Sequence, residues 1–283
     1  MAIARSYLYV PGDREEVLAR AAGRGADALI IDLEDAVAPA SKDRARELVS
    51  AFLRDPPVGL ALWVRVNPGA EALTDLEAVV APALAGVCLA KAETAVEVTA
   101  VADALGDLER RRDIAPGAIG ISALLESAAA VSRINEIATA PRVIRLQLGE
   151  ADLKADLGVE LGPDERELLW VRSRAVLASA AAGIDPPVAP VSIDFRDVDA
   201  LRESTRALKR LGYRGRACVH PAQVEVVNDV FTPSVEELER ARELIEGYEA
   251  ALAAGSGVFV DATGRMVDLA VVRAARRILE LAR

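Results

Sequence analysis

Histidine is almost absent from this sequence, and cysteine is scarce. His220 is the one histidine, and the two cysteines, Cys88 and Cys218, lie far apart in apolar runs. This composition excludes an HExxH zinc site, a multi-histidine metal site and a Cys/His zinc finger. The separated cysteines are typical of reduced thiols in a core. Any bound metal is therefore expected to be a hard cation held by carboxylates, which points to Mg²⁺ or Mn²⁺.

Aromatic residues, long apolar runs and excess positive charge are lacking as well. Phe, Trp and Tyr make up 4% of the 283 residues, so the core must consist of aliphatic side chains. No stretch without charges approaches the roughly 18 apolar residues of a membrane helix, and the N-terminus does not resemble a signal peptide. The net charge of −10 is spread along the chain and would repel duplex nucleic acid. We expect a soluble, cytoplasmic protein that binds neither nucleic acid nor membranes.

Short apolar runs alternate with segments of helical period along the chain. Several runs are apolar throughout, as expected for parallel strands buried on both faces. Eight such strand–helix units predict an α/β fold, a (β/α)8 TIM barrel over residues 1–254. A doubly wound open sheet is the alternative, but no GxGxxG or Walker loop follows the first run. The predicted strands are residues 7–10, 28–33, 62–66, 86–90, 119–125, 143–148, 188–193 and 217–219.

Local spacing also predicts where helices begin. Ser41 is a candidate N-cap for an amphipathic helix, because the apolar residues after it follow the spacing of one helix face. Thr94 with Glu97, and Ser234 with Glu237, have the spacing of capping boxes. These pairs predict the first turns of two further helices.

Residues 255–283 exceed what a barrel needs. Two short β-prone runs flank an Asp-Ala-Thr-Gly turn at residues 261–264, and a last Arg-rich helix follows. We expect a C-terminal hairpin–helix extension. Leu269, Val272 and Leu279 recur on one side of its helix and need a surface to bury against. The sequence therefore predicts packing on a neighbouring subunit, and hence a homo-oligomer.

Charged residues, most of them acids, follow nearly every predicted strand. The C-terminal ends of barrel strands form the active-site mouth of a TIM barrel. Several carboxylates at one mouth repel each other unless a cation lies among them, and Mg²⁺ with water and substrate oxygens meets that need. The alternative is that each acid caps a helix or pairs with an arginine at the rim. The strand-end residues are Asp32, Glu34, Asp35, Arg65, Lys91, Glu93, Glu126, Glu150, Asp152, Asp194 and His220.

Three basic residues at the mouth have different expected roles. Arg65 follows an apolar strand, and its fork suits bidentate binding of a carboxylate; an ion pair with Glu34 or Asp35 is compatible with that role. Lys91 is expected to stay a protonated ammonium among acids. His220, which precedes a proline, is expected to be a hydrogen-bonded structural residue more than a general base.

Six segments in chain order together resemble the citrate lyase β-subunit-like branch of the HpcH/HpaI aldolase superfamily. They cover nearly the whole chain. The DLEDAV segment together with the later Glu126 and Asp152 is what makes the resemblance specific to this family. Residues Asn228, Phe231 and Pro233 extend the last segment. The segments are residues 5–12 (RSYLYVPG), 27–37 (DALIIDLEDAV), 64–67 (VRVN), 124–127 (LLES), 149–153 (GEADL) and 218–223 (CVHPAQ).

The resemblance implies a Mg²⁺-dependent TIM-barrel lyase that acts on thioesters of hydroxy acids with CoA or an acyl-carrier protein. By position it makes Glu126 and Asp152 the metal ligands and places Glu126 beside the substrate. Arg65 would bind the keto-acid end, and Glu34 and Asp35 would order metal-bound water and the reacting groups.

The resemblance also implies a trimer in which the C-terminal region covers a neighbour's active site. Asp268 is then a catalytic aspartate, and capping of the last helix is its other expected role. Arg14, Lys42 and Arg44, in loops after the first two strands, are the candidate CoA contacts; solvated charges at helix starts explain them equally well. Citrate lyase β subunits need an acyl-carrier partner, and the sequence leaves the carrier open.

The expected reaction is cleavage of a citryl-, malyl- or citramalyl-CoA thioester to an acyl-CoA and a 2-keto acid. The alternatives are a hydroxyacyl-CoA thioester hydrolase, a malate-synthase-like condensing enzyme and a non-enzymatic scaffold that binds CoA esters. The superfamily's free pyruvate aldolases rely on a histidine near the start of the barrel, and no histidine precedes His220.

Overall fold

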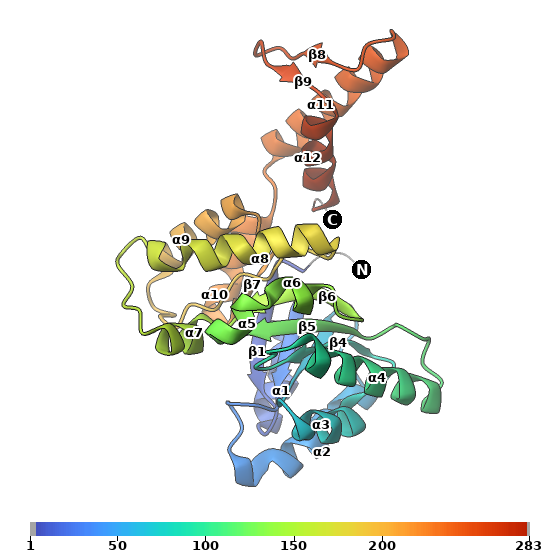
Figure 1. Ribbon diagram of the computed structural model, residues 1–283, viewed down its shortest axis with the longest axis vertical. Helices are drawn as coiled ribbons and strands as arrows, with labels where there is room; N and C mark the ends of the chain where they lie inside the picture. Colours follow the sequence, from blue (N-terminus) through green and yellow to red (C-terminus); the bar gives the residue numbers. More distant parts are fainter. Residues whose placement is uncertain (1–3, 282–283) are drawn as a thin grey trace. The chain divides into compact units, whose positions relative to one another are not determined.

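Parallel strands at most of the predicted apolar runs form one curled sheet. The computed structural model describes residues 4–281. Within them the sheet has the strand order β6-β5-β4-β3-β2-β1-β7, and every adjacent pair is parallel. The curled α/β sheet confirms the predicted barrel architecture (Figure 1). The strands are β1 (Ser6–Pro11), β2 (Ala28–Asp32), β3 (Ala61–Val66), β4 (Leu84–Leu89), β5 (Gly120–Leu125), β6 (Val143–Leu148) and β7 (Arg216–Cys218).

The strand predicted over residues 188–193 is wrong in its extent. Only two isolated parallel bridges form there, between Val188 and Gln147 and between Ala189 and Arg216. Prolines at 186, 187 and 190 remove the backbone donors that a longer strand would need. The two bridges nevertheless connect β6 to β7, the two edges of the sheet, so the sheet closes on itself.

The amphipathic segments form helices, and two capping predictions are confirmed. The side chains of Thr94 and Ser234 each accept a hydrogen bond from the backbone N–H of the Glu three residues later. The carboxylate of that Glu accepts one from the backbone N–H of the Thr or Ser. Ser41 stands at the predicted N-cap of α2, but its side chain makes no cap bond, since a 3-10 turn leads directly into the helix. The helices before the C-terminal unit are α1 (Glu15–Ala21), α2 (Lys42–Arg54), α3 (Ala70–Val79), α4 (Ala95–Arg111), α5 (Ala128–Ser132), α6 (Ile134–Ala138), α7 (Glu150–Leu157), α8 (Leu169–Ala182), α9 (Val198–Leu211) and α10 (Ala222–Phe231).

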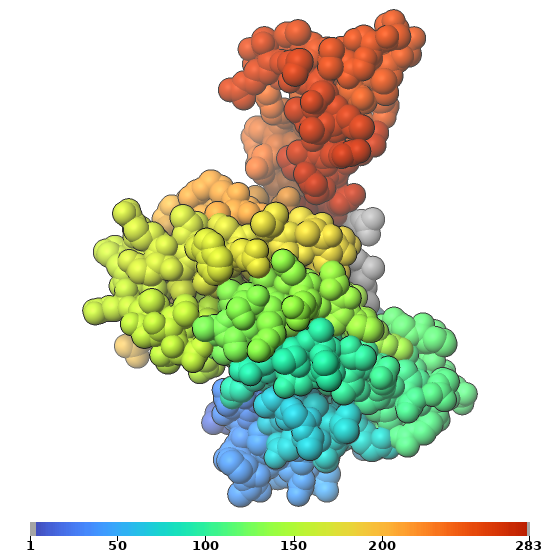
Figure 2. Space-filling view, in the orientation of Figure 1, coloured from blue at the N-terminus to red at the C-terminus, as the bar shows by residue number. Residues whose placement is uncertain are grey.

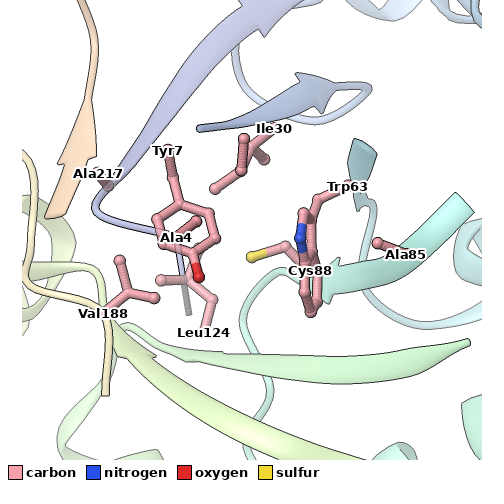
Figure 3. Close-up of a cluster of buried hydrophobic side chains, with 10 residues drawn as sticks. Ala4, Tyr7, Ile30, Trp63, Ala85, Cys88, Leu124, Val188 and Ala217 are labelled. Carbon is pink, nitrogen blue, oxygen red and sulfur yellow. The ribbon is translucent and has the colours of Figure 1, made fainter. Parts of the chain in front are cut away.

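The inner face of the sheet encloses a mixed aliphatic and aromatic core. Tyr7 and Trp63 meet edge to face, with ring centroids 6.5 Å apart, and Cys88 and Leu124 belong to the same buried cluster (Figure 3). Cys88 and Cys218 are both buried free thiols, as predicted. Helices lie on the outer side of the sheet (Figure 1), and the space-filling view shows one closely packed face of the barrel unit (Figure 2). No helix within residues 4–281 has the length and apolar character to cross a bilayer.

Within the described residues, 4–228 form one compact unit, the barrel, and 229–281 form a second compact unit. This boundary precedes the expected one at residue 254, because the long helix α11 (Val235–Ala253) packs with α12 (Leu269–Glu280). The predicted hairpin is present as β8 (Phe259–Val260) and β9 (Met266–Val267). Tyr248, Val267 and Val272 form a small core within this second unit. Val272 is buried within this core of its own unit, whereas Leu269 is 42% exposed.

Candidate active site

A cavity of about 300 Å³ opens where the barrel strands end. Asp32 is the last residue of β2 and Arg65 lies near the end of β3. Glu126 follows β5 directly, and Asp152 lies in the first turn of α7, after β6. The sheet thus brings together Arg65, Glu126 and Asp152, although Arg65 and Asp152 are 87 positions apart in the sequence. The charged residues that line the cavity are Asp32, Arg65, Glu126, Glu150 and Asp152.

Arg65 is held in place by two carboxylates and a ring. Its Nε and Nη2 donate to the two oxygens of Asp32, at 2.7 and 2.5 Å, and its Nη1 lies 3.1 Å from Glu34 Oε2. The guanidinium also lies over the ring of Tyr9, 5.2 Å from its centroid. Burial opposes the charge, but the hydrogen bonds to Asp32 and its negative charge outweigh burial and raise the pKa of Arg65. Arg65 is therefore a fixed, permanent cation in the cavity.

Glu126 is a buried carboxyl with little local compensation. Its side chain accepts a hydrogen bond of 2.9 Å from the backbone N–H of Lys91. Lys91 has a left-handed backbone conformation, with φ of 49°, which is costly for a residue with a side chain. Burial, together with the negative charges of Glu34 and Asp152, outweighs that bond and the charge of Arg65, and raises the pKa of Glu126 to about 7.

Gly149 leaves the space that the Glu126 carboxyl occupies. A Cβ added at Gly149 would lie 2.5 Å from Glu126 Oε1, closer than side chains approach each other. The φ of this glycine is −92°, so its backbone does not require glycine. The steric fit to Glu126 alone explains the residue. Gly149 belongs to the GEADL segment, but no sequence pattern predicts this contact.

The donor set fits Mg²⁺ when substrate supplies further ligands. Within residues 4–281 no three His, Cys, Asp or Glu side chains converge closely enough to hold a metal ion alone. Glu126 and the exposed Asp152 do line one cavity, and their mutual repulsion contributes to the raised pKa of Glu126. A hard cation would relieve that repulsion, and Mg²⁺ commonly uses one or two carboxylates while it keeps several waters.

Glu34 and Asp35 form the acidic side of the mouth with Lys91. The Lys91 ammonium pairs with Glu34, and it lies 3.3 Å from Asp35. The hydrogen bond to Glu34 raises the pKa of Lys91 even against partial burial. The lysine therefore stays protonated, which agrees with the sequence-based expectation and disfavours a Schiff-base role.

The three candidate CoA contacts occupy different environments. The ammonium of Lys42 donates to the backbone oxygens of Leu33 and Glu34, at 2.9 and 3.2 Å, and to Asn67 Oδ1 at 2.5 Å. Its donors are thus used to hold the ends of β2 and β3 in place. Arg14 and Arg44 are exposed beside α1 and in α2.

Two further predicted residues have clear structural roles. His220 Nδ1 accepts a hydrogen bond of 3.1 Å from Ala222 N, and the ring stacks on Phe195 with centroids 4.6 Å apart. The expected structural role of His220 is thus present. Asp268 is the N-cap of α12 and accepts from the backbone N–H groups of Ala270 and Val271. Its helix-capping role is confirmed.

Asp32 is the functional residue that the sequence-based site assignment missed. The sequence predicts that it lies at a strand end but predicts no role for it. Its position opposite Arg65 follows from the register of β2 and β3, in which the two residues are direct partners. The apolar runs predict the strands but not this register.

Comparisons with known proteins identify the family of the chain. The model of the HpcH/HpaI aldolase/citrate lyase family matches residues 5–221. Citrate lyase subunit beta of Leuconostoc mesenteroides subsp. cremoris is 34% identical over 283 residues, which covers 98% of this chain and 93% of the relative. A (3S)-malyl-CoA thioesterase of Cereibacter sphaeroides (strain ATCC 17025 / ATH 2.4.3) is 36% identical over 278 residues, or 97% and 93% of the two chains.

A solved structure matches the fold over nearly the full length. Protein CitE from Mycobacterium tuberculosis, in complex with magnesium, acetoacetate and coenzyme A, has a TM-score of 0.78 and 31% sequence identity. The match covers 99% of this chain and 98% of that chain.

Proposed function

Because the chain belongs to the HpcH/HpaI aldolase/citrate lyase family, we propose that it is a Mg²⁺-dependent carbon–carbon lyase. Its substrate is a hydroxyacyl-CoA thioester, and its products are an acyl-CoA and a 2-keto acid. One observation carries the proposal: a fixed cation, Arg65, shares a cavity with two carboxylates, Glu126 and Asp152, that suit a hard metal. The magnesium and CoA complex of the similar Mycobacterium tuberculosis protein supports it.

Glu126 and Asp152 would hold the metal, and substrate oxygens and water would complete its ligand sphere. When bound, Mg²⁺ supplies a Lewis acid that lowers the pKa of the substrate hydroxyl and stabilises the developing carbonyl. Glu34 and Asp35, beside Lys91, would order metal-bound water and the reacting groups at the edge of the site.

Arg65 binds the carboxylate next to the hydroxyl-bearing carbon. Asp32 accepts from Nε and Nη2 and Glu34 lies beside Nη1, so one N–H of each terminal nitrogen remains for the substrate. Because Asp32 fixes the guanidinium before substrate arrives, the carboxylate is held without a reorganisation cost. The substrate hydroxyl loses its proton to solvent, its C–O bond becomes the keto group, and the carbon–carbon bond breaks to leave the enolate of the thioester. That enolate takes up a proton from solvent to give the acyl-CoA.

Oligomeric assembly and CoA binding complete the proposal. The protein is a homotrimer in which the C-terminal unit of one subunit covers the cavity of a neighbour. This cover shields the enolate from water, and it also supplies Asp268 to the site. The CoA phosphates contact Arg14 and Arg44 at the exposed rim, and Lys42 orients the loop beside them.

A thioester hydrolase is the second candidate, and the 36% identical malyl-CoA thioesterase favours it. A product assay with malyl-, citramalyl- and citryl-CoA, with and without Mg²⁺, tests both. Acyl-CoA with equimolar 2-keto acid supports the lyase, and free CoA with intact hydroxy acid supports the hydrolase. Arg65→Lys keeps the charge but loses the fork, so it should lower kcat/KM for the preferred ester by about 100-fold. Metal-independent turnover, or wild-type kinetics of Arg65→Lys, would overturn the proposed site.

A further inference from the structure

Lys91 contacts two acids of the active site although it does not line the cavity. Resting on the proposed lyase function, we infer that Lys91 is a positioning residue: its ammonium holds Glu34 against Arg65 and thereby fixes the guanidinium that binds the substrate carboxylate. Within residues 4–281, the wall of the cavity includes Arg65 and Glu126 but not Lys91. The lysine therefore acts through Glu34 and not by contact with the substrate.

The charges of four side chains alternate along this side of the mouth. Asp32 accepts two hydrogen bonds from Arg65, and the Nη1 atom of Arg65 lies 3.1 Å from Glu34 Oε2. Lys91 pairs with the other oxygen of Glu34. Glu34 is only 3% exposed, so its charge is costly unless it is paired. Lys91 supplies the second positive charge that makes this row of two acids and two cations neutral.

The two oxygens of Glu34 have different partners, and Lys91 is the printed partner of one of them. Oε2 accepts a hydrogen bond of 2.7 Å from the backbone N–H of Asp35 and lies beside Arg65. Oε1 accepts from the Lys91 ammonium, which also lies 3.3 Å from the exposed Asp35. Loss of the ammonium leaves Oε1 without this donor, so the carboxyl is free to turn. Arg65 then loses the partner of its Nη1.

The backbone of Lys91 gives independent support. Its φ of 49° is left-handed, a conformation that glycine adopts freely and that is costly for lysine. In this conformation its N–H donates to Glu126, at 2.9 Å, while its side chain reaches Glu34. Glycine would make the same backbone bond at a lower cost. What glycine lacks is the ammonium, and this points to a role for that group beyond stability.

Kinetics on the preferred thioester test the inference with the full-length protein and Mg²⁺. Lys91→Met keeps an unbranched side chain and loses the charge, so kcat/KM should fall at least about 30-fold, mainly through a raised KM. Lys91→Arg restores the charge and should return kcat/KM to within about tenfold of the wild type. Lys209→Met on α9 is the matched control and should stay within about twofold. Wild-type kinetics of Lys91→Met would overturn the inference.

A double-mutant cycle tests whether Lys91 acts through Glu34. In a Glu34→Gln background, Lys91→Met should lower kcat/KM by less than about threefold, because the residue through which it acts is already changed. A full loss in both backgrounds would show that the lysine acts on the substrate directly, and would contradict the inference.

Lys91→Gly separates the charge from the backbone. Glycine relieves the left-handed strain, so this variant should unfold at a higher temperature than Lys91→Met. Its kcat/KM should nevertheless be as low as that of Lys91→Met, since neither variant carries the ammonium. A merely structural lysine predicts instead that activity follows thermal stability. Activity of Lys91→Gly within about threefold of the wild type would refute the role of the ammonium.

Nitrogen NMR of Arg65 separates this inference from the proposed function. In protein with isotope-labelled arginine, the two Nη signals of Arg65 exchange as the guanidinium rotates, and Arg65→Lys identifies them by their loss. Lys91→Met should speed this exchange at least about tenfold, whereas Lys91→Arg and Lys209→Met should not. If no ester is cleaved but the exchange changes in this way, the lyase proposal fails and the positioning by Lys91 stands. An unchanged exchange rate in Lys91→Met would overturn the positioning whatever the ester kinetics show.

Discussion

Asp32 accepts two hydrogen bonds from Arg65, at 2.7 Å from Nε and 2.5 Å from Nη2. The two residues are register partners on β2 and β3, so the sheet itself places the carboxylate beside the guanidinium. Asp32 also accepts from the backbone N–H groups of Glu34 and Ala36, at 2.9 and 3.1 Å. With both oxygens engaged, Asp32 fixes the orientation of Arg65 while its own position is fixed by the following turn.

Asp32→Asn should therefore impair Arg65 without removing it. The amide keeps the size but loses the charge and one acceptor, so the guanidinium is no longer held in one orientation. We expect kcat/KM to fall by about 100-fold, with KM for the thioester raised. Steady-state kinetics on the preferred ester measure this. Asp27→Asn is the matched control, because it breaks an Asp–Arg pair with Arg5 just before the start of the same strand. Equal losses in both variants would contradict a specific role for Asp32.

Gly149→Ala should disturb the metal site through Glu126 alone. The new methyl group would lie 2.5 Å from Glu126 Oε1 and would force that carboxyl to move. We expect the Mg²⁺ concentration for half-maximal activity to rise at least about tenfold, with little change in secondary structure. Gly23→Ala is the matched control, because its added methyl group would have no other atom within 4 Å. Gly117→Ala is unsuitable, because the positive φ of Gly117 would strain any side chain. Unchanged Mg²⁺ dependence in Gly149→Ala would argue against Glu126 as a ligand.

The raised pKa of Glu126 predicts a pH-dependent affinity for Mg²⁺. Burial raises this pKa from 4.5 to about 7, so the folded metal-free protein holds a proton that Mg²⁺ must displace. Affinity for Mg²⁺ should thus rise about tenfold from about pH 6 to about pH 8. Calorimetric titration at several pH values measures it. A flat profile would show that Glu126 does not titrate with metal binding.

The same shift predicts the sign of a stability change. A group whose pKa is raised on folding stabilises the folded state less as pH rises from 4.5 through about 7. Glu126→Gln removes that penalty, so the metal-free variant should unfold at a higher temperature than the wild type at about pH 8. Added Mg²⁺ should raise the Tm of the wild type and not that of the variant.

Much of the fold was predictable because its signals are local. Apolar runs and capping boxes depend on neighbours within a few residues, and Thr94 and Ser234 make the bonds that their spacing predicts. The strand predicted at 188–193 is shortened to two bridges, because nearby prolines lack the backbone donors that an apolar run alone implies. The contact of Asp32 with Arg65 and the fit of Gly149 to Glu126 depend on register and on packing between strands, which no local pattern contains.

The C-terminal unit predicts an assembly. Its hairpin and helix leave Val260, Met266 and Leu269 exposed by 67%, 66% and 42%, which suits burial against another subunit. We expect the full-length protein to be a trimer by light scattering. Deletion of residues 255–283 should abolish lyase activity, and Asp268→Asn should lower it while leaving the mass in solution unchanged. A monomeric full-length protein, or full activity after the deletion, would contradict the shared active site.

Cleavage of the preferred thioester in D₂O tests the account most directly. If the carbon–carbon bond breaks to leave a thioester enolate, solvent must supply the proton that quenches it. With Mg²⁺ and the wild-type protein, mass spectrometry should find acyl-CoA that carries one solvent deuterium, in equal amount to the 2-keto acid, and Glu126→Ala should give neither product. Free CoA with an intact hydroxy acid, or the same products from Glu126→Ala, would contradict it.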